Sequence, residues 1–135
     1  MRIWRATKRR IGASFPRANQ NSRDQLIAAG QSYFDYFKSN TGTVPWGNPC
    51  YRLEGGKGCT PAIDQASPSC NVGIPMGVTF ATPHWVVDLD IQSAVGMTRM
   101  GGDFGLPDIH LFRVPNGTIR YIHTMTVCTT PNCGM

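Results

Sequence analysis

Hydrophobic residues between positions 22 and 39 repeat with the spacing of an amphipathic helix. Apolar side chains three or four residues apart form one stripe: Leu26, Ala29, Tyr33, Phe34 and Phe37. The stripe follows Ser22-Arg23-Asp24-Gln25, a capping box in which the serine hydroxyl and the glutamine side chain satisfy each other's backbone N–H groups. Asn40-Thr41-Gly42 is typical of a helix end. The pattern therefore predicts one helix over this segment.

From Val78 onward, alternating and apolar runs separated by turn residues indicate β-strands. Residues 85–87 lead through a loop of about four or five residues into a strand at 94–100, which predicts a first hairpin. A second hairpin joins 109–114 to 119–127, because Asn-Gly between apolar strands favours a tight turn with positive φ.

Residues 42–77 are rich in Gly, Pro and Cys, and there only the alternating run at 50–54 predicts a strand. One helix followed by antiparallel strands is an α+β layer architecture. We therefore expect a curved antiparallel sheet packed on an N-terminal amphipathic helix.

The Asn116-Gly117 turn also predicts which side chains meet across the second hairpin. A two-residue loop pairs Phe112 with Tyr121 and His110 with His123. One face would then carry both histidines: Asp108, His110, Phe112, Val114, Ile119, Tyr121, His123 and Met125. The opposite face would place Arg113 against Arg120 at the turn, and opposed like charges need solvent.

This pairing suggests general acid/base chemistry in an apolar cleft. His123 or His110 would be the base, Asp108 would orient the imidazole, and Tyr121 would donate a hydrogen bond to a developing oxyanion. The alternative is that both histidines are structural, hydrogen-bonded residues of the sheet.

Five further side chains are candidate ligand contacts. Arg52 and Glu54 share one face of the predicted strand at 50–54, where they either hold a polar group or form an ion pair at the surface. Tyr33 would reach a cavity between helix and sheet or lie in the core, and we add Phe112 and Trp85 as apolar walls. Asp88 and Asp90 flank a turn, where aspartate favours local backbone bonding.

Charge divides the chain into two parts. The full sequence of 135 residues has 13 Lys+Arg and 8 Asp+Glu, but six of the cations fall within the first seventeen residues, which contain no acid. We expect a basic, disordered leader at 1–20 and a single, nearly neutral domain at 21–135. The folded part lacks a basic face with aromatics, which argues against nucleic-acid binding, and no apolar run is long enough to span a membrane.

The cysteines favour an oxidising compartment. Cys50, Cys59, Cys70, Cys128 and Cys133 form no CxxC pair and have no histidine at zinc-ligand spacing, so disulfides are favoured over a metal site, with the pairing open. The leader lacks the apolar segment of a secretory signal peptide. The alternative is that it is a presequence that targets the protein to an organelle. We expect an extracellular protein without a metal or cofactor.

Several motifs together resemble a known group of proteins. They are CYRLEG at 50–55, WVVD at 85–88, HLFRVPNGTIRYIH at 110–123 and TVCTTPNCG at 126–134. Together they are similar to an uncharacterised, mostly fungal family of secreted proteins related to the SnoaL-like branch of the nuclear transport factor 2-like superfold. The resemblance covers about residues 24–135.

The resemblance implies a cone-like domain with a ligand pocket at its open end, often dimeric and usually without a cofactor. Since only one of the superfold's usual three helices is evident here, the cone is expected to be incomplete. We expect binding of a small apolar molecule, with cofactor-free isomerisation, cyclisation or dehydration as the chemistry. The alternative is a secreted, disulfide-stabilised binding module without catalysis.

Overall fold

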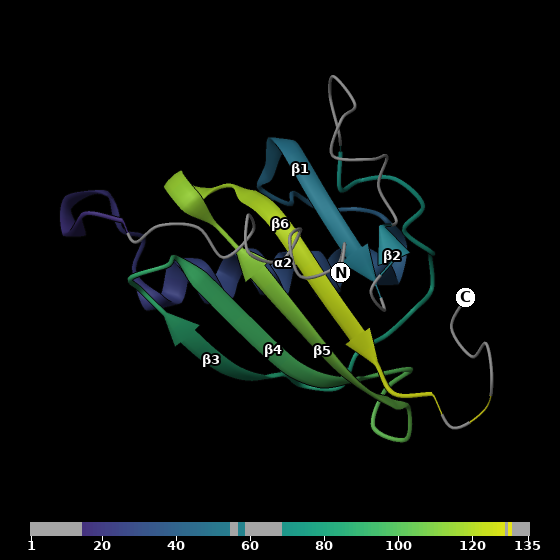
Figure 1. Ribbon diagram of the computed structural model, residues 1–135. Coiled ribbons are helices and arrows are strands. Elements are labelled where there is room, and N and C mark those ends of the chain that lie inside the picture. The colour runs from purple at the N-terminus through teal and green to yellow at the C-terminus, as the bar shows by residue number, and fades with distance from the viewer. Residues whose placement is uncertain (1–14, 55–56, 59–68, 129, 131–135) are drawn as a thin grey trace.

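The computed structural model describes residues 15–54, 57–58, 69–128 and 130. Within these residues, one α-helix packs against one face of a six-stranded sheet that does not close into a barrel (Figure 1). The strand order is β2-β1-β6-β5-β4-β3. The elements are η1 (Arg17–Asn19), α2 (Arg23–Ser39), β1 (Trp46–Glu54), β2 (Lys57–Gly58), β3 (His84–Asp88), β4 (Ser93–Met100), β5 (Leu106–Arg113), η2 (Pro115–Gly117) and β6 (Ile119–Thr126). The predicted α+β class is confirmed.

Helix α2 begins and ends where the local signals predict. The Gln25 N–H donates to the Ser22 hydroxyl at 3.2 Å, and the Ser22 N–H donates to the Gln25 side chain at 2.8 Å. Asn40 ends the helix in the left-handed conformation. The buried positions of α2 are the predicted stripe with Gly30 added, so this helix is fixed by local sequence and by burial of one face.

The sheet is mixed, which corrects the antiparallel prediction. Strands β1 and β6 run parallel, with Arg52 opposite Ile122 and Glu54 opposite Thr124. A parallel pair needs a long connection, and here β3, β4 and β5 lie between the two strands in sequence. Strand β1 therefore joins the last strand, β6, on one side and the two-residue strand β2 on the other, which places it next to the edge of the sheet.

The β3–β4 hairpin has the predicted form, with Asp88 opposite Ser93. In the β5–β6 hairpin the turn itself is also as predicted: Asn116 and Gly117 have positive φ, and the Thr118 N–H donates to the Pro115 carbonyl. The register beyond the turn is wrong by one residue. His110 pairs with Thr124, whereas His123 pairs with Leu111.

Bonds to other segments explain this shift. The Ile119 N–H donates to the Pro45 carbonyl and the Val114 N–H to the Gln92 carbonyl, so at the turn end neither residue completes the hairpin ladder. One extra residue of β6 is accommodated there, as in a β-bulge. A shift of one residue moves every following side chain of β6 to the opposite face of the sheet.

The same shift changes the surroundings of Arg113. It pairs with Tyr121 rather than with Arg120, and the Phe15 ring lies 5.8 Å from its guanidinium carbon. Arg113 is consequently buried, and burial lowers its pKa. The expectation of a solvated arginine pair is therefore wrong. Residues 1–14 of the predicted leader lie outside the described residues, and its remaining part contains the 3-10 helix η1.

The core lies between α2 and one face of the sheet, which we call the inner face. Tyr33, Phe34 and Phe37 of the helix pack there with Phe112 and Ile122. Gly30 lets the helix approach closely, because a Cβ atom at this position would lie 2.5 Å from the Trp85 ring. The other side of the sheet, the outer face, carries no helix among the described residues (Figure 1).

Candidate functional site

Strand pairing gathers polar side chains at one end of the inner face. Glu54, Thr124 and His110 occupy one row across β1, β6 and β5, and Asp108 lies opposite Thr126 in the next row. Paired residues present their side chains to the same face. The face is the inner one, because the His110 ring lies against Tyr33 of α2 at 5.5 Å between centroids.

The Asp108 carboxylate and the His110 imidazole form a buried, closely spaced pair. His110 Nδ1 lies 2.7 Å from Asp108 Oδ2, and the side chains are 2% and 0% exposed. The Thr126 hydroxyl donates to the other carboxylate oxygen at 2.7 Å. Because a carboxylate only accepts, the proton of a neutral imidazole belongs on Nδ1. Nε2 is then the nitrogen that can accept a proton.

Aromatic rings surround this imidazole. The His110 ring centroid lies 5.0 Å from Phe34, 5.7 Å from Phe80 and 5.8 Å from Phe112, the last in a stacked arrangement. The pair of titratable groups therefore sits in an apolar setting, as acid/base residues in active sites often do.

Tyr33 brings a hydroxyl group to the same region. The side chain is fully buried, and the Arg52 guanidinium lies within hydrogen-bonding reach of its hydroxyl oxygen. Burial raises the pKa of Tyr33, against the opposing effect of the nearby Arg52 guanidinium, while Glu54 and Asp108 raise it further. The hydroxyl is therefore protonated at neutral pH and is available as a donor.

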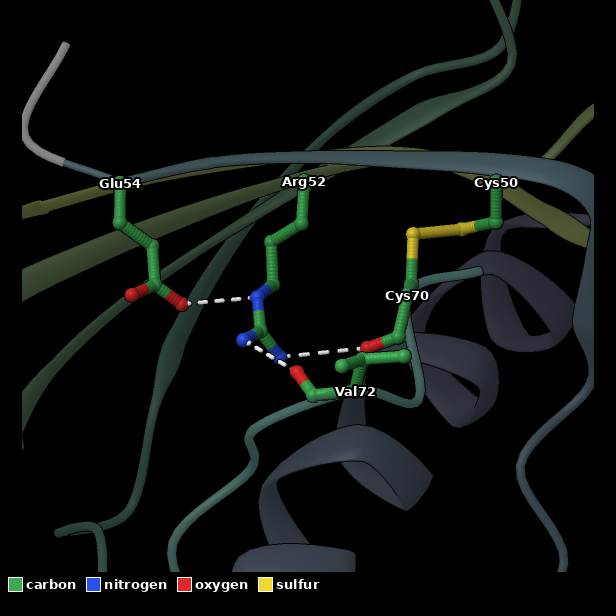
Figure 2. Close-up of polar contacts among 5 residues, drawn as sticks. All are labelled: Cys50, Arg52, Glu54, Cys70 and Val72. Carbon is green, nitrogen blue, oxygen red and sulfur yellow. Dashed lines mark hydrogen bonds and ion pairs between the residues drawn. A yellow bond between two sulfur atoms is a disulfide. The ribbon is translucent and has the colours of Figure 1, made fainter. Parts of the chain in front are cut away.

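Arg52 stands beside this region on β1, and Figure 2 shows its partners. Its Nε lies 2.9 Å from Glu54 Oε1, and its two terminal nitrogens donate to the Cys70 carbonyl at 3.2 Å and the Val72 carbonyl at 2.7 Å. The Cys50–Cys70 disulfide holds these carbonyls next to β1. The Arg52 side chain is 3% exposed and that of Glu54 is 38% exposed, so the pair links the interior to the surface.

The predicted site is therefore divided between the two faces. Asp108, His110, Tyr33 and Phe112 come together on the inner face, and Trp85 packs against Phe112 at 6.2 Å. Tyr121 and His123 belong to the outer face, where Tyr121 stacks on Tyr51 with ring centroids 5.5 Å apart. The predicted pairing of His110 with His123 is wrong, because the register differs by one residue.

Sequence reasoning missed two features of the site. Thr124 stands between Glu54 and His110, and its buried hydroxyl has no hydrogen-bond partner in the described part of the chain. Phe80 contacts His110 from an irregular segment with no periodic pattern. The correct register would have identified Thr124, whereas no signal in the sequence indicated Phe80.

A groove of about 300 Å³ lies beside this site, between α2 and the segment at 79–83. Its lining combines two aromatic rings with polar groups: Gln31, Phe34, Asp35, Lys38, Thr79, Phe80, Ala81, Thr82 and Pro83. Neither His110 nor His123 lines it. The groove and His110 nevertheless share Phe34 and Phe80.

Features that bear on compartment and metal binding are few. Cys50 pairs with Cys70, and Cys128 also takes part in a disulfide, which is compatible with an extracellular protein. Within the described ranges, no group of His, Cys, Asp and Glu side chains could hold a metal ion. None of the described helices is long and apolar enough to cross a membrane.

Comparison with known proteins gives one match. The family described as a domain of unknown function, DUF8021, matches residues 19–126, which span η1 through β6 and include the whole candidate site. A match was found neither among curated proteins nor among solved structures. The chain therefore belongs to the DUF8021 family of domains.

Proposed function

We propose that this domain binds a small, uncharged and mainly apolar molecule at the inner face, and that His110 transfers a proton on it. The observation that carries the proposal is the fully buried Asp108–His110 pair, with Nδ1 held by the carboxylate. Isomerisation, cyclisation and dehydration need such a base and no cofactor. The resemblance to SnoaL-like proteins of the nuclear transport factor 2-like superfold supports the same class of reaction.

Each inner-face side chain then has one role. His110 Nε2 accepts a proton from the ligand and returns it at another atom, and Asp108 orients the ring and stabilises the imidazolium. Tyr33 takes the role predicted for Tyr121 and donates a hydrogen bond to the oxygen that becomes negative.

Charges in the site favour a neutral ligand. Arg52 and Glu54 balance each other, and Asp108 is balanced once His110 carries a proton. An anionic ligand would add an unpaired charge in a buried region, which is costly. Proton transfer from a neutral ligand to His110 Nε2 forms an imidazolium beside the Asp108 carboxylate, and the negative charge left on the ligand oxygen is met by the Tyr33 hydroxyl.

One substitution distinguishes the base from the second histidine. His110→Gln is expected to lower proton transfer at least about 100-fold, the usual contribution of a general base, whereas His123→Gln on the outer face leaves it within a few-fold. The measurement is deuterium uptake from D₂O into a panel of small enolisable ketones, followed by NMR. Equal rates for wild type and His110→Gln would contradict the role of His110.

A second candidate is a secreted, disulfide-stabilised binding module without chemistry. Direct packing of four aromatic rings on His110 favours it, since a structural histidine would have the same surroundings. Uptake with none of the ketones, together with ligand-induced shifts at Tyr33, would support this candidate. Both candidates place the protein outside the cell, in keeping with the Cys50–Cys70 disulfide.

We also propose that the outer face pairs with a second copy of the chain. Register places seven apolar residues side by side across five strands, and we call them the outer apolar band: Leu53, Val86, Val95, Met97, Ile109, Leu111 and Met125. Four of them, Val86, Met97, Ile109 and Met125, are exposed. An apolar sheet face of this kind is commonly covered by another sheet.

Size and charge favour a weak homodimer. Five strands spaced about 4.8 Å apart and about 20 Å long present roughly 500 Å² per copy, at the lower limit for a specific interface. From residue 18 to the C-terminus, the chain has seven cations and eight acids, so this part of two copies repels little. We therefore expect a dissociation constant in the micromolar range, which is usual for a small interface.

Two methionines of similar exposure test this surface. Met125, 65% exposed, belongs to the band, and Met76, 68% exposed, lies in a loop outside it. Met125→Lys is expected to weaken the dimer at least about tenfold by sedimentation equilibrium, because a charge would be buried, whereas Met76→Lys leaves it unchanged. A wild-type chain that remains monomeric at several hundred micromolar would refute the dimer.

A further inference from the structure

The groove between α2 and residues 79–83 is separated from His110 by only two side chains. Phe34 and Phe80 line the groove, and the same two rings contact the imidazole at 5.0 and 5.7 Å. They also contact each other, with centroids 4.6 Å apart. The rings of Phe34 and Phe80 therefore lie between a molecule in the groove and the imidazole of His110.

These two rings differ in how easily they can move. Phe34 is buried in the middle of α2, where it also packs on Trp85 and Phe112. Phe80 is half-buried on a segment outside the regular strands, joined to β4 by an isolated bridge to Met100. Side-chain rotation at a partly exposed position is fast and inexpensive compared with repacking a helix.

The backbone around Phe80 is nevertheless held in place. The Ala81 N–H donates to the Arg99 carbonyl at 3.0 Å, and the Thr98 hydroxyl donates to the Ala81 carbonyl at 2.6 Å. The Gly101 N–H donates to the Thr79 carbonyl at 2.7 Å. A change at this position is thus a rotation of the Phe80 ring about its side-chain bonds, with the segment itself fixed.

We propose that this groove is the outer half of the ligand site and that the Phe80 ring is the gate between it and His110. The inference rests on the proposed function and adds the position of the ligand. Without ligand, Phe80 closes the site by packing on Phe34, Phe37 and His110. An apolar ligand that takes over these ring contacts compensates for their loss, so binding shifts the population toward the open rotamer.

The lining of the groove also defines the class of ligand. Its floor is the two phenyl rings, while Asp35 and Lys38, of opposite charge, stand at the helix side. Gln31 donates to Asp35 at 2.9 Å and so occupies part of that carboxylate. A ligand that fits both walls has an uncharged apolar body with a polar group at one end only.

Paramagnetic broadening tests the gate without relying on catalysis. The probe is 4-hydroxy-TEMPO, a small uncharged nitroxide, and the signals are the ring protons of the three histidines in the full-length protein. His84, which is exposed, provides the fully accessible reference. Phe80→Ala is expected to increase the broadening of the His110 signals at least about threefold over wild type. Phenol, added at millimolar concentration, should then shift the His110 signals in this variant.

A matched variant separates gating from general loosening of the core. Phe37 contacts Phe80 at 5.2 Å but does not line the groove, so Phe37→Ala removes a ring of equal size without opening the path. Phe80→Trp retains a bulky ring and should leave His110 at or below the wild-type broadening. Equal broadening of His110 in Phe80→Ala and Phe37→Ala, or none in either, overturns the gate. If no ketone exchanged deuterium, proton transfer by His110 would be refuted, whereas the broadening result for the Phe80 gate would still stand.

Discussion

Replacement of Asp108 by alanine is expected to lower the free energy of unfolding by about 2–4 kcal/mol, because each buried polar group that loses its partner costs about 1–3 kcal/mol. The Asp108 side chain is 0% exposed; one carboxylate oxygen accepts from the Thr126 hydroxyl, and the other lies 2.7 Å from His110 Nδ1. Removal of the carboxylate leaves the buried His110 imidazole and the half-buried Thr126 hydroxyl without this partner. Most of the loss is therefore the cost of these two orphaned groups and not the strength of the original pair.

Chemical denaturation followed by circular dichroism measures this change. Asp103→Ala provides the control, because Asp103 is an exposed residue of the loop before β5 and its loss should change the free energy by less than about 0.5 kcal/mol. Asp108→Asn should fall in between, since the amide oxygen can still accept one of the two hydrogen bonds. A loss below about 1 kcal/mol for Asp108→Ala would show that the pair is well solvated and would contradict its assignment to the core.

Local sequence signals predicted the helix and the turns. Hydrogen bonds between distant segments determine which side chains meet across the strands. The helix required only a capping box at Ser22, an apolar stripe and the end at Asn40, all within one short segment. The Asn116-Gly117 turn likewise formed as predicted. In each case the interactions that select the structure lie within a few residues of one another.

The register of the last hairpin failed because its cause is distant in sequence. A turn fixes the pairing only as far as the ladder is continuous, and here Pro45 and Gln92 take the N–H groups of Ile119 and Val114. Neither bond is visible in the pattern of β5 and β6. One residue of offset was enough to move His123 to the outer face and to bring Thr124 beside His110.

The backbone partners of Arg52 could not be predicted from the sequence, for a different reason. Five cysteines allow many pairings, and the sequence does not select Cys50–Cys70. Without that pair, the carbonyls of Cys70 and Val72 could not be placed next to β1. The ion pair with Glu54, one of the two alternatives left open by the sequence, is present, but the guanidinium is buried and its two backbone partners were missed.

Removal of the Cys50–Cys70 disulfide should have the second large effect. The two cysteines are 20 residues apart, and a closed loop of this length restricts the unfolded chain by about 3 kcal/mol. Cys50→Ala/Cys70→Ala is therefore expected to lower the free energy of unfolding by about 3 kcal/mol in chemical denaturation. A loss of less than about 1 kcal/mol would contradict this contribution of the cross-link to stability.

The disulfide and Arg52 should also depend on each other. When the cross-link is absent, the segment that offers the Cys70 and Val72 carbonyls is held less tightly, and the buried guanidinium loses ordered acceptors. Arg52→Met removes the charge but keeps an unbranched chain, so a double-mutant cycle with the two cysteine changes measures the coupling. We expect about 1–2 kcal/mol, because groups joined in one hydrogen-bond network are non-additive by this order. Additive losses would mean that Arg52 keeps its place without the disulfide and would contradict the coupling.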